Sequence, residues 1–312
     1  MILSCGEALI DFVPRHLSDG ATAFRPCPGG SPMNTAVALG RLGVSVGFLT
    51  QVSRDFFGDL LIEHMRESKV EVGLISRTDL PTTLAFVSAP QGEDVRYAFY
   101  NQTTADFSFA PESLPDSLPE SVTALQFGSI SLTGEPCATA WETLIFRESS
   151  RRCLSLDPNI RPSLIPDRSR YLERLERWIT QCHLIKASSE DLEWLYPGHS
   201  LEQVARHWRS LGAHLVLITD GGKASHAFGD CGAVEVAVQP TQVVDAVGAG
   251  DTFHAAVLAW LEERGQLSSQ GLKRLTVEEL RSCLGFANRV ARVVCQREGA
   301  NPPWRHELQE PA

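Results

Sequence analysis

The 312-residue sequence has no stretch of 18 apolar residues, no run of five Lys or Arg, and no Cys-x-x-Cys pair. The first absence argues against a transmembrane helix. The second argues against nucleic acid or an anionic membrane as a partner. With 28 Lys and Arg against 38 Asp and Glu, the formal net charge is −10. A phosphate ligand would therefore need a locally built site of backbone N–H groups, a few cationic side chains and metal.

The cysteines and the N-terminus bear on the cellular compartment. The eight cysteines are scattered without zinc-site spacing, which indicates reduced core thiols, with a catalytic thiol as the alternative. The opening MILSCGEALIDF has no basic region and carries Glu7 and Asp11 within its apolar run. It therefore predicts a buried strand rather than a signal peptide. We expect a cytoplasmic protein.

Short apolar runs alternate with helical patterns along most of the chain. The predicted strands are 2–5 with 8–12, 46–52, 124–128, 153–156, 183–186 and 214–219. The predicted helices are 34–42, 56–66, 138–148, 169–180, 200–211, 251–264 and 277–295. This alternation predicts an α/β fold, with a mostly parallel central sheet and helices on both faces. We expect one domain over residues 1–312 with an insertion, although the length also allows two domains.

Two segments break this alternation. Residues 12–28 are rich in Pro and Gly, and residues 81–100 hold two apolar runs separated by Gln91-Gly92-Glu93, which is typical of a hairpin. A few strands outside the main sheet are too small to be stable alone. Residues 12–28 and 81–106 are therefore either a small β lid over a site or surface decoration. The free strand edges of a lid could pair with a second chain, which would make a homodimer.

The segment VVDAVGAGDTF, residues 243–253, holds the strongest chemical signal. A helix is expected to open near Ala249, so the N–H groups of the small residues 248–250 would stay uncovered at its positive end. Such a terminus is a ready anion site. Asp251 in the first turn is either a helix cap or a general base that takes a proton from an attacking hydroxyl.

Two further polar residues could belong to the same site. Asn34 follows the glycine turn of PGGSPMNTA, residues 28–36, where its amide would either cap a helix or contact a ligand hydroxyl. Asp11 interrupts the first apolar run near the expected end of that strand. Ligands of α/β sheets bind beyond the carboxyl ends of strands. Asp11 is therefore either a turn residue or part of a polyol pocket with Asn34 and Asp251.

These two glycine segments resemble the signatures of a known family. Residues 29–36 and DAVGAGD, 245–251, resemble the N- and C-terminal signatures of the PfkB family of ribokinase-like carbohydrate kinases, in the same order and about 210 residues apart. The resemblance covers essentially the whole chain. It implies a ribokinase-like three-layer α/β/α sandwich with a small β lid, ATP as phosphate donor and Mg²⁺ as bridging metal. Asp245 and its neighbours resemble the loop that binds a monovalent cation such as K⁺ in many members of the family.

The resemblance also implies a role for each matching residue. Asp251 would be the general base, and the backbone of Gly248, Ala249 and Gly250 would form the anion hole. The residues that would hold sugar hydroxyls are Asp11, Gly30 and Asn34.

Other matches extend this assignment to the nucleotide and the metal. Ile218-Thr219-Asp220-Gly221 and Phe286-Ala287-Asn288 resemble segments beside the nucleotide, so Thr219, Gly221 and Asn288 would contact ATP. Ser188-Ser189-Glu190-Asp191 stands where the family has N-x-x-E, so Ser188 would face the nucleotide and Glu190 or Asp191 would serve Mg²⁺. In Asp157-Pro158-Asn159-Ile160-Arg161, which resembles a fructokinase-like segment, Arg161 would reach substrate or phosphate; a surface salt bridge is the alternative.

We therefore expect ATP-dependent phosphorylation of a sugar primary hydroxyl, with D-fructose as the first candidate and fructose 6-phosphate as product. The alternatives are a 2-keto-3-deoxygluconate kinase, a ribokinase or a nucleoside kinase. A sugar- or nucleotide-sensing protein that keeps the fold without turnover is an alternative of another class. The carboxylate at Asp251 favours an enzyme, because a sensor would not need it.

Overall fold

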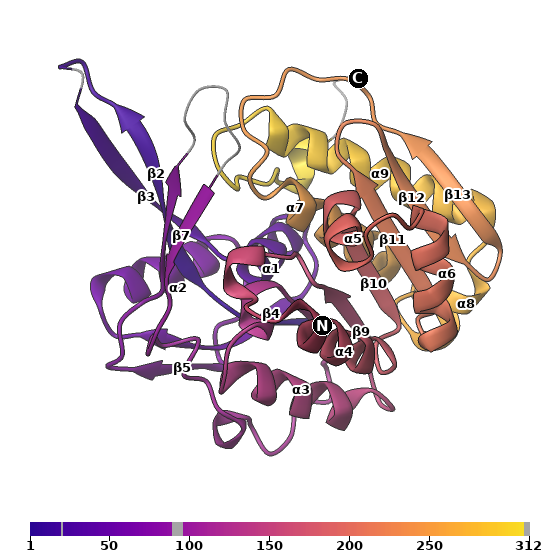
Figure 1. Cartoon of the computed structure of the whole chain (residues 1–312), viewed down its shortest axis with the longest axis horizontal. Coiled ribbons are helices and arrows are strands. Elements are labelled where there is room, and N and C mark those ends of the chain that lie inside the picture. The colour runs from indigo at the N-terminus through magenta and orange to yellow at the C-terminus, as the bar shows by residue number, and fades with distance from the viewer. Residues whose placement is uncertain (20, 89–95, 309–312) are drawn as a thin grey trace.

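The computed structural model describes residues 1–19, 21–88 and 96–308 (Figure 1). Among these residues, nine strands form the larger sheet in the order β13-β12-β11-β10-β9-β8-β1-β4-β5. Neighbouring strands are parallel except at β11–β12 and β12–β13, which are antiparallel. The strands are β1 (Ile2–Cys5), β4 (Val46–Ser53), β5 (Ile75–Thr78), β8 (Ala124–Gly128), β9 (Cys153–Asp157), β10 (Leu184–Ser188), β11 (Leu215–Asp220), β12 (Ala224–Gly229) and β13 (Gly232–Ala237).

Helices cover both faces of this sheet. They are α1 (Ser31–Arg41), α2 (Phe56–Glu67), α3 (Cys137–Glu148), α4 (Arg168–Ile179), α5 (Ser189–Leu195), α6 (Leu201–Leu211), α7 (Ala249–Glu263), α8 (Ser269–Arg274) and α9 (Val277–Cys295). Successive strand residues point to opposite faces. Ile2 accordingly packs in a core with α1, α2, α7, α8 and α9, whereas Leu3 packs in a second core with α3 to α6. The expected three-layer α/β/α sandwich is confirmed.

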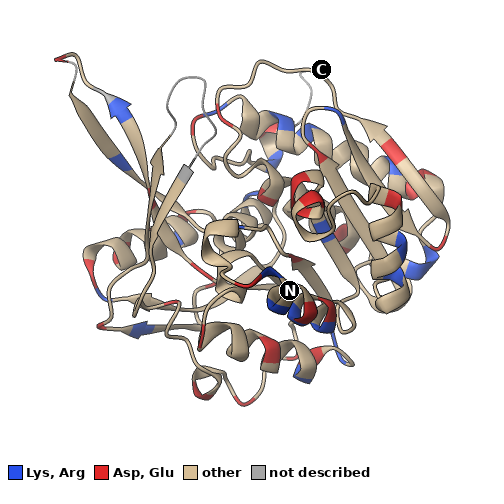
Figure 2. Cartoon of the chain, in the orientation of Figure 1, with Lys and Arg blue, Asp and Glu red and all other residues tan. Residues whose placement is uncertain are grey.

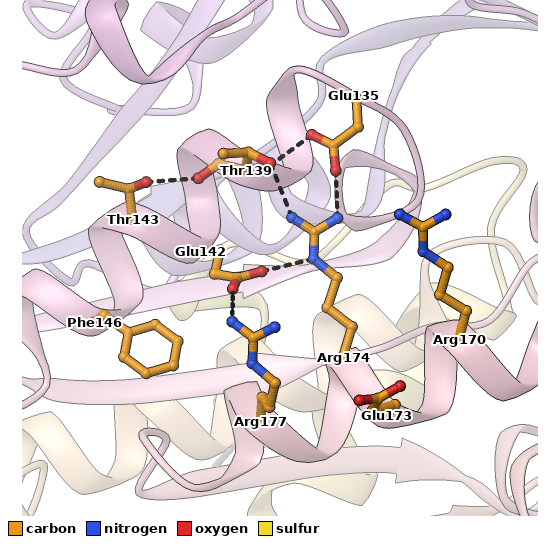
Figure 3. A pocket seen from close by; sticks show the side chains of 9 residues that line it. All are labelled: Glu135, Thr139, Glu142, Thr143, Phe146, Arg170, Glu173, Arg174 and Arg177. Carbon is orange, nitrogen blue, oxygen red and sulfur yellow. Dashed lines mark hydrogen bonds and ion pairs between the residues drawn. The ribbon is translucent and has the colours of Figure 1, made fainter.

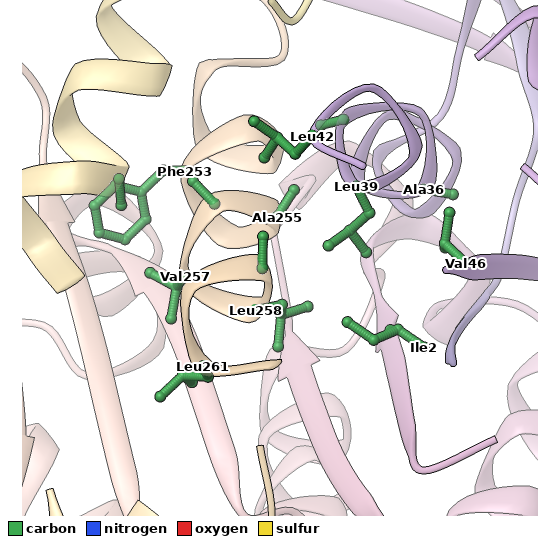
Figure 4. Close-up of a cluster of buried hydrophobic side chains, with 14 of the residues drawn as sticks. Ile2, Ala36, Leu39, Leu42, Val46, Phe253, Ala255, Val257, Leu258 and Leu261 are labelled. Carbon is green, nitrogen blue, oxygen red and sulfur yellow. The ribbon is translucent and has the colours of Figure 1, made fainter. Parts of the chain in front are cut away.

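The first core places α1 directly beside α7. Figure 4 shows Leu39 and Leu42 of α1 facing α7, with Ile2 of β1 and Val46 of β4 below them. Ala255 and Ala259 of α7 are fully buried, and their small side chains let the two helices approach closely. This packing brings the N-terminal turns of α1 and α7 together, and these turns carry the two glycine segments.

A smaller sheet of four strands stands beside the main body, in the order β3-β2-β6-β7. Its strands are β2 (Leu9–His16), β3 (Thr22–Gly29), β6 (Leu84–Ser88) and β7 (Arg96–Tyr100). The β2–β3 hairpin projects away from the body (Figure 1). The expected small β lid is present, although its first hairpin extends beyond 12–28 at both ends. The predicted turn at 91–93 lies outside the described residues.

One expectation about the N-terminus is wrong. Residues 8–12 do not continue the first strand of the main sheet, because β1 ends at Cys5 and the chain crosses into the lid. Asp11 therefore lies within β2, paired with Cys27 of β3 and Ala85 of β6, and not at a strand end.

The surface and the cysteines complete this description. No helix in the described ranges is long and apolar enough to cross a membrane. Figure 2 shows acidic and basic residues on many helices and loops, close to one another. All eight cysteines are free; five are buried, whereas Cys27, Cys231 and Cys295 are only partly buried, so not every thiol is a core residue.

Candidate active site

The loop of residues 243–248 is called the phosphate loop here after its expected ligand. It ends at Gly248, which caps α7 in a left-handed conformation with φ of 76°. A Cβ atom there would lie 2.6 Å from the Cβ of Ala300, so both the backbone angle and the close packing favour glycine. The helix starts at Ala249, as the sequence predicts. The N–H of Ala249 donates to the carbonyl of Ala246 at 3.2 Å. The N–H groups in the first turn of a helix have no intrahelical acceptor and can bind an anion, so an anion site at this end of α7 stays a prediction.

Asp251 is held by side chains of α1 rather than by its own helix. Its Oδ1 accepts a hydrogen bond from Ser31 Oγ at 2.6 Å, and its Oδ2 accepts one from Asn34 Nδ2 at 2.9 Å. Neither α1 nor α7 has a side-chain cap hydrogen bond at its N-terminus. The capping alternatives for Asp251 and Asn34 are therefore wrong. Gly30 is the N-cap of α1, directly before Ser31 and four residues before Asn34.

Asp11 faces the same region from the lid. Burial raises the pKa of Asp11 to about 7, while Arg161 acts to lower it and Asp251 to raise it further. The Asp11 side chain fits against β3 because residue 29 is a glycine. A Cβ atom at Gly29 would lie only 2.1 Å from Asp11 Oδ2. A carboxyl placed here can accept hydrogen bonds from polyol hydroxyls.

Arg161 extends from the loop after β9 toward the lid. Its guanidinium lies over the ring of Tyr97 of β7, 5.7 Å from the centroid, and donates to the backbone oxygens of Asn159 and Ile160. Its guanidinium also donates to Asn159 Oδ1 at 2.8 Å. None of the salt bridges among the described residues includes Arg161, so the surface-pair alternative is not observed. Asp11, Arg161 and Tyr97 thus border one side of the space next to Asp251.

A buried ion pair that was not expected from the sequence lies beneath the phosphate loop. Lys186 Nζ of β10 is 2.8 Å from Asp157 Oδ2 at the end of β9, with side chains only 4% and 1% exposed. A Cβ on Gly250 would lie 3.1 Å from Lys186 Nζ, so the ammonium lies against the first turn of α7. Burial alone would lower the pKa of Lys186, but the nearby carboxylates, chiefly Asp157, outweigh it and raise the pKa. A lone Lys in an apolar strand is the signal that could have pointed to this pair.

Three of the four proposed nucleotide residues lie at or just after the ends of two neighbouring strands. Ser188 ends β10 and caps α5, and Thr219 lies near the end of the adjacent β11. Gly221 follows in the turn with φ of 52°. Asn288 lies on α9, and its Nδ2 is buried without a hydrogen-bond partner among the described residues. An orphaned buried donor of this kind fits a site that receives a ligand acceptor.

The two candidates for metal contact differ in environment. Asp191 is buried, and its carboxylate accepts from Ser188 N, Ser188 Oγ and Ile160 N at 2.7 to 2.8 Å. Glu190 is exposed in the first turn of α5. The described residues contain no cluster of three or more His, Cys, Asp or Glu placed to hold a metal. This arrangement fits Mg²⁺ only as an ion held largely by phosphates and water, with one carboxylate nearby.

Asp245 ties the loop before α7 to the segment after α9. Its Oδ1 accepts from Val247 N at 3.0 Å and its Oδ2 from Gly299 N at 2.9 Å. The N–H of Val244 donates to the carbonyl of Cys295 at 2.7 Å. Asp245 therefore holds the shape of the phosphate loop, and the carboxylate is partly exposed beside it.

A surface hollow of about 570 Å³ lies elsewhere, between α3 and α4 (Figure 3). It is lined mainly by charged side chains that pair with one another: Arg174 contacts Glu135 and Glu142, and Arg177 contacts Glu142. None of the candidate site residues lines it. The ion pairs account for the polar lining of this hollow, so we assign no binding or catalytic role to it.

The buried side chain of Glu7 is expected to make the stability of the protein depend on pH. Burial raises the pKa of Glu7 from 4.5 to about 7, against hydrogen bonds that act to lower it. Between these values the folded protein holds the proton more tightly than the unfolded chain does. The protonated Glu7 side chain therefore adds to the free energy of unfolding. Its contribution is fully present below pH 4.5 and is lost as pH rises through 7, a change of about 3 kcal/mol.

Glu7→Gln, whose side chain stays neutral, is expected to remove this part of the pH dependence. Urea denaturation at several values between pH 4.5 and 8 measures the free energy of unfolding. The exposed Glu190→Gln is the matched control and should keep the wild-type slope. Equal slopes for Glu7→Gln and the wild type would contradict the prediction.

Comparison with known proteins agrees with this geometry. The chain is 40% identical over 282 residues to a fructokinase of Rhizobium leguminosarum bv. trifolii, covering 90% of this chain and 86% of that protein. It is 33% identical to fructokinase-1 of Zea mays, covering 99% and 96%. A crystal structure of fructokinase with bound ATP from Xylella fastidiosa superposes with a TM-score of 0.89 at 31% identity, covering 98% and 97%. The family model described as pfkB family carbohydrate kinase matches residues 1–307, and the chain belongs to that family.

Proposed function

We propose that this carbohydrate kinase transfers the γ-phosphoryl group of ATP to the primary hydroxyl of D-fructose, giving fructose 6-phosphate and ADP. The observation that carries the proposal is the position of Asp251, a buried carboxylate next to the first-turn N–H groups of α7. The fructokinase names of relatives at 40% and 33% identity support fructose as acceptor.

The reaction requires one bond to form and one to break. The sugar O6 attacks the γ-phosphorus, its proton passes to Asp251, and the bond from phosphorus to the β,γ-bridging oxygen breaks to release ADP. The N–H groups of residues 248–250 would hold the charge that develops on the phosphoryl oxygens. Asp11, Gly30 and Asn34 would orient the sugar so that O6 approaches in line.

The cofactor assignments follow from the contacts above. ATP would lie across the strand ends at Ser188, Thr219 and Gly221, with Asn288 at the adenine side. Mg²⁺ would neutralise phosphate charge, with Glu190 as the accessible carboxylate and Asp191 holding the loop around it. A monovalent cation such as K⁺ would lie at the loop that Asp245 shapes. Because ATP is the donor, we propose the cytoplasm as the compartment.

A sugar panel tests the proposed acceptor. ADP release would be measured with D-fructose, D-ribose, 2-keto-3-deoxygluconate and a nucleoside, each with saturating ATP. We expect the highest kcat/KM for D-fructose. A preference for the keto acid would contradict this and would assign Arg161 to its carboxylate. Tight binding of ATP and sugar with no turnover would favour the sensor.

We also propose that residues 1–312 form one kinase domain whose lid pairs with the lid of a second copy. Asp11 and Phe12 alternate along β2, so aromatic side chains lie on the face opposite the sugar. Phe12 stacks on Phe86 at 4.6 Å, and Phe24 and Tyr100 pack edge-on against Phe86. Phe24 is 44% and Tyr100 62% exposed. An exposed aromatic patch on free strands is suited to association.

Phe24→Glu is expected to convert a dimer to a monomer, because a charge would enter the apolar contact. Sedimentation velocity at several concentrations would measure the mass. Phe146→Glu is the matched control, because Phe146 on α3 is also 44% exposed but lies away from the lid. A monomeric wild type, or equal masses for the wild type and Phe24→Glu, would contradict lid pairing.

A further inference from the structure

Ser31 contacts the proposed base and has no role in the scheme above. It is the first residue of α1, and its hydroxyl donates to Asp251 Oδ1 at 2.6 Å. One turn later Asn34 donates to Oδ2 at 2.9 Å. Ser31, Asn34 and Asp251 are 7%, 8% and 7% exposed. Both oxygens of the carboxylate are therefore occupied before any sugar arrives.

The backbone around Ser31 is fixed from beneath. Glu7, only 1% exposed, accepts from Ser31 N and from Ser131 N, each at 3.2 Å. The carbonyl of Pro32 accepts from Ser4 Oγ of β1 at 2.7 Å. These contacts anchor the start of α1 to the central sheet, so the Ser31 hydroxyl is presented from a rigid position.

The two contacts on Asp251 are not equivalent. A hydroxyl that donates to a carboxylate at 2.6 Å forms a short, charge-assisted bond, whereas the amide contact is longer. Asn34 is also a proposed sugar ligand, so its amide can turn to the sugar when O6–H replaces it at Oδ2. Ser31 has no such second task.

We infer that Ser31 is a positioning residue that holds Asp251 Oδ1 and thereby leaves Oδ2 as the oxygen that takes the proton from the sugar hydroxyl. The inference rests on the proposed role of Asp251 as general base. Ser31 fixes the rotation of the carboxylate and stabilises its charged form until the proton transfers.

Other charged groups also act on this carboxylate and must be kept constant in the test. Lys186 of β10 lies against the first turn of α7, paired with Asp157 of β9. Asp11 of β2 and Tyr97 of β7 face the site from the lid. Variants at Ser31 leave all four groups in place, so a change in pH dependence can be assigned to the lost hydroxyl.

The test compares Ser31→Ala, Ser31→Thr and Thr35→Val in the full-length protein. Ser31→Ala is expected to lower kcat about tenfold to a hundredfold, because one charge-assisted hydrogen bond is lost. The KM for fructose should stay within about twofold, and the acidic limb of the kcat/KM profile should move about one unit to higher pH. Ser31→Thr, which keeps a hydroxyl, should recover most of kcat and the wild-type profile.

Thr35→Val is the matched control on the same helix. It removes a buried hydroxyl that has no partner among the described residues and does not touch Asp251. It should leave kcat and the pH profile unchanged. Ser31→Ala with wild-type kcat and profile, or with a loss of kcat and an unmoved acidic limb, would overturn the inference. An active Asp251→Asn would instead show that the proposed base is wrong.

Discussion

Asp251→Asn is expected to lower kcat by about 10²–10⁴ while the KM for fructose stays nearly unchanged, because only the proton acceptor is lost. The amide has the shape of the carboxylate. Its oxygen can accept from Asn34, and its NH₂ can donate to the Ser31 hydroxyl, so both contacts of the native side chain are replaced. Steady-state kinetics and calorimetric titration of fructose would separate catalysis from binding.

Thermal melting supplies the control for Asp251→Asn. The variant should unfold within a few degrees of the wild type, because no buried group loses its partner. A variant that keeps a near wild-type kcat would show that another group removes the proton. A variant that loses fructose binding together with kcat would place Asp251 among the sugar ligands instead.

Lys186→Met is expected to give the largest loss of stability. It leaves the carboxylate of Asp157 buried without its cation, which costs about 3–5 kcal/mol. It should also lower kcat, because a positive charge next to Gly250 is removed from the site where phosphoryl charge develops. Urea denaturation measures the free energy of unfolding, and initial rates of ADP release measure kcat.

A double variant separates the two effects. Lys186→Met with Asp157→Asn removes both charges, so it should regain most of the lost stability without regaining kcat. Arg152→Met is a matched control, because Arg152 pairs with the buried Glu148 at 2.8 Å, away from the phosphate loop. It should lower stability and leave kcat unchanged. A double variant with full activity would show that the Lys186 charge has no part in the reaction.

Much of the fold was predictable because strand and helix periods differ. The helical periodicity predicted α2, α3, α4 and α9 to within a residue or two of their ends. The β12–β13 hairpin was missed, because β12 carries polar residues at Ser225 and His226 and β13 is mostly exposed, so neither strand is a continuous apolar run. The continuation of the first strand was wrong because the apolar run does not show where β1 leaves the sheet at Cys5.

The parts of the site that could be predicted are those in which neighbouring residues in the sequence form the local structure. The Gly248 turn and the start of α7 at Ala249 follow from small residues before a helix. The contact between Asn34 and Asp251 spans 217 residues, so the residues alone offered a shared pocket only as one of two alternatives, which the family resemblance then favoured. The partners of Ser31 and Lys186 depend on how α1, α7 and β10 pack, which no local pattern encodes.

The most direct test is a crystal structure with fructose and a non-hydrolysable ATP analogue. We expect the γ-phosphate to contact the N–H groups of residues 248–250, with the fructose O6 within hydrogen-bond distance of Asp251 Oδ2 and Ser31 still bonded to Oδ1. A γ-phosphate bound away from residues 248–251, or a sugar whose primary hydroxyl does not reach Asp251, would contradict it.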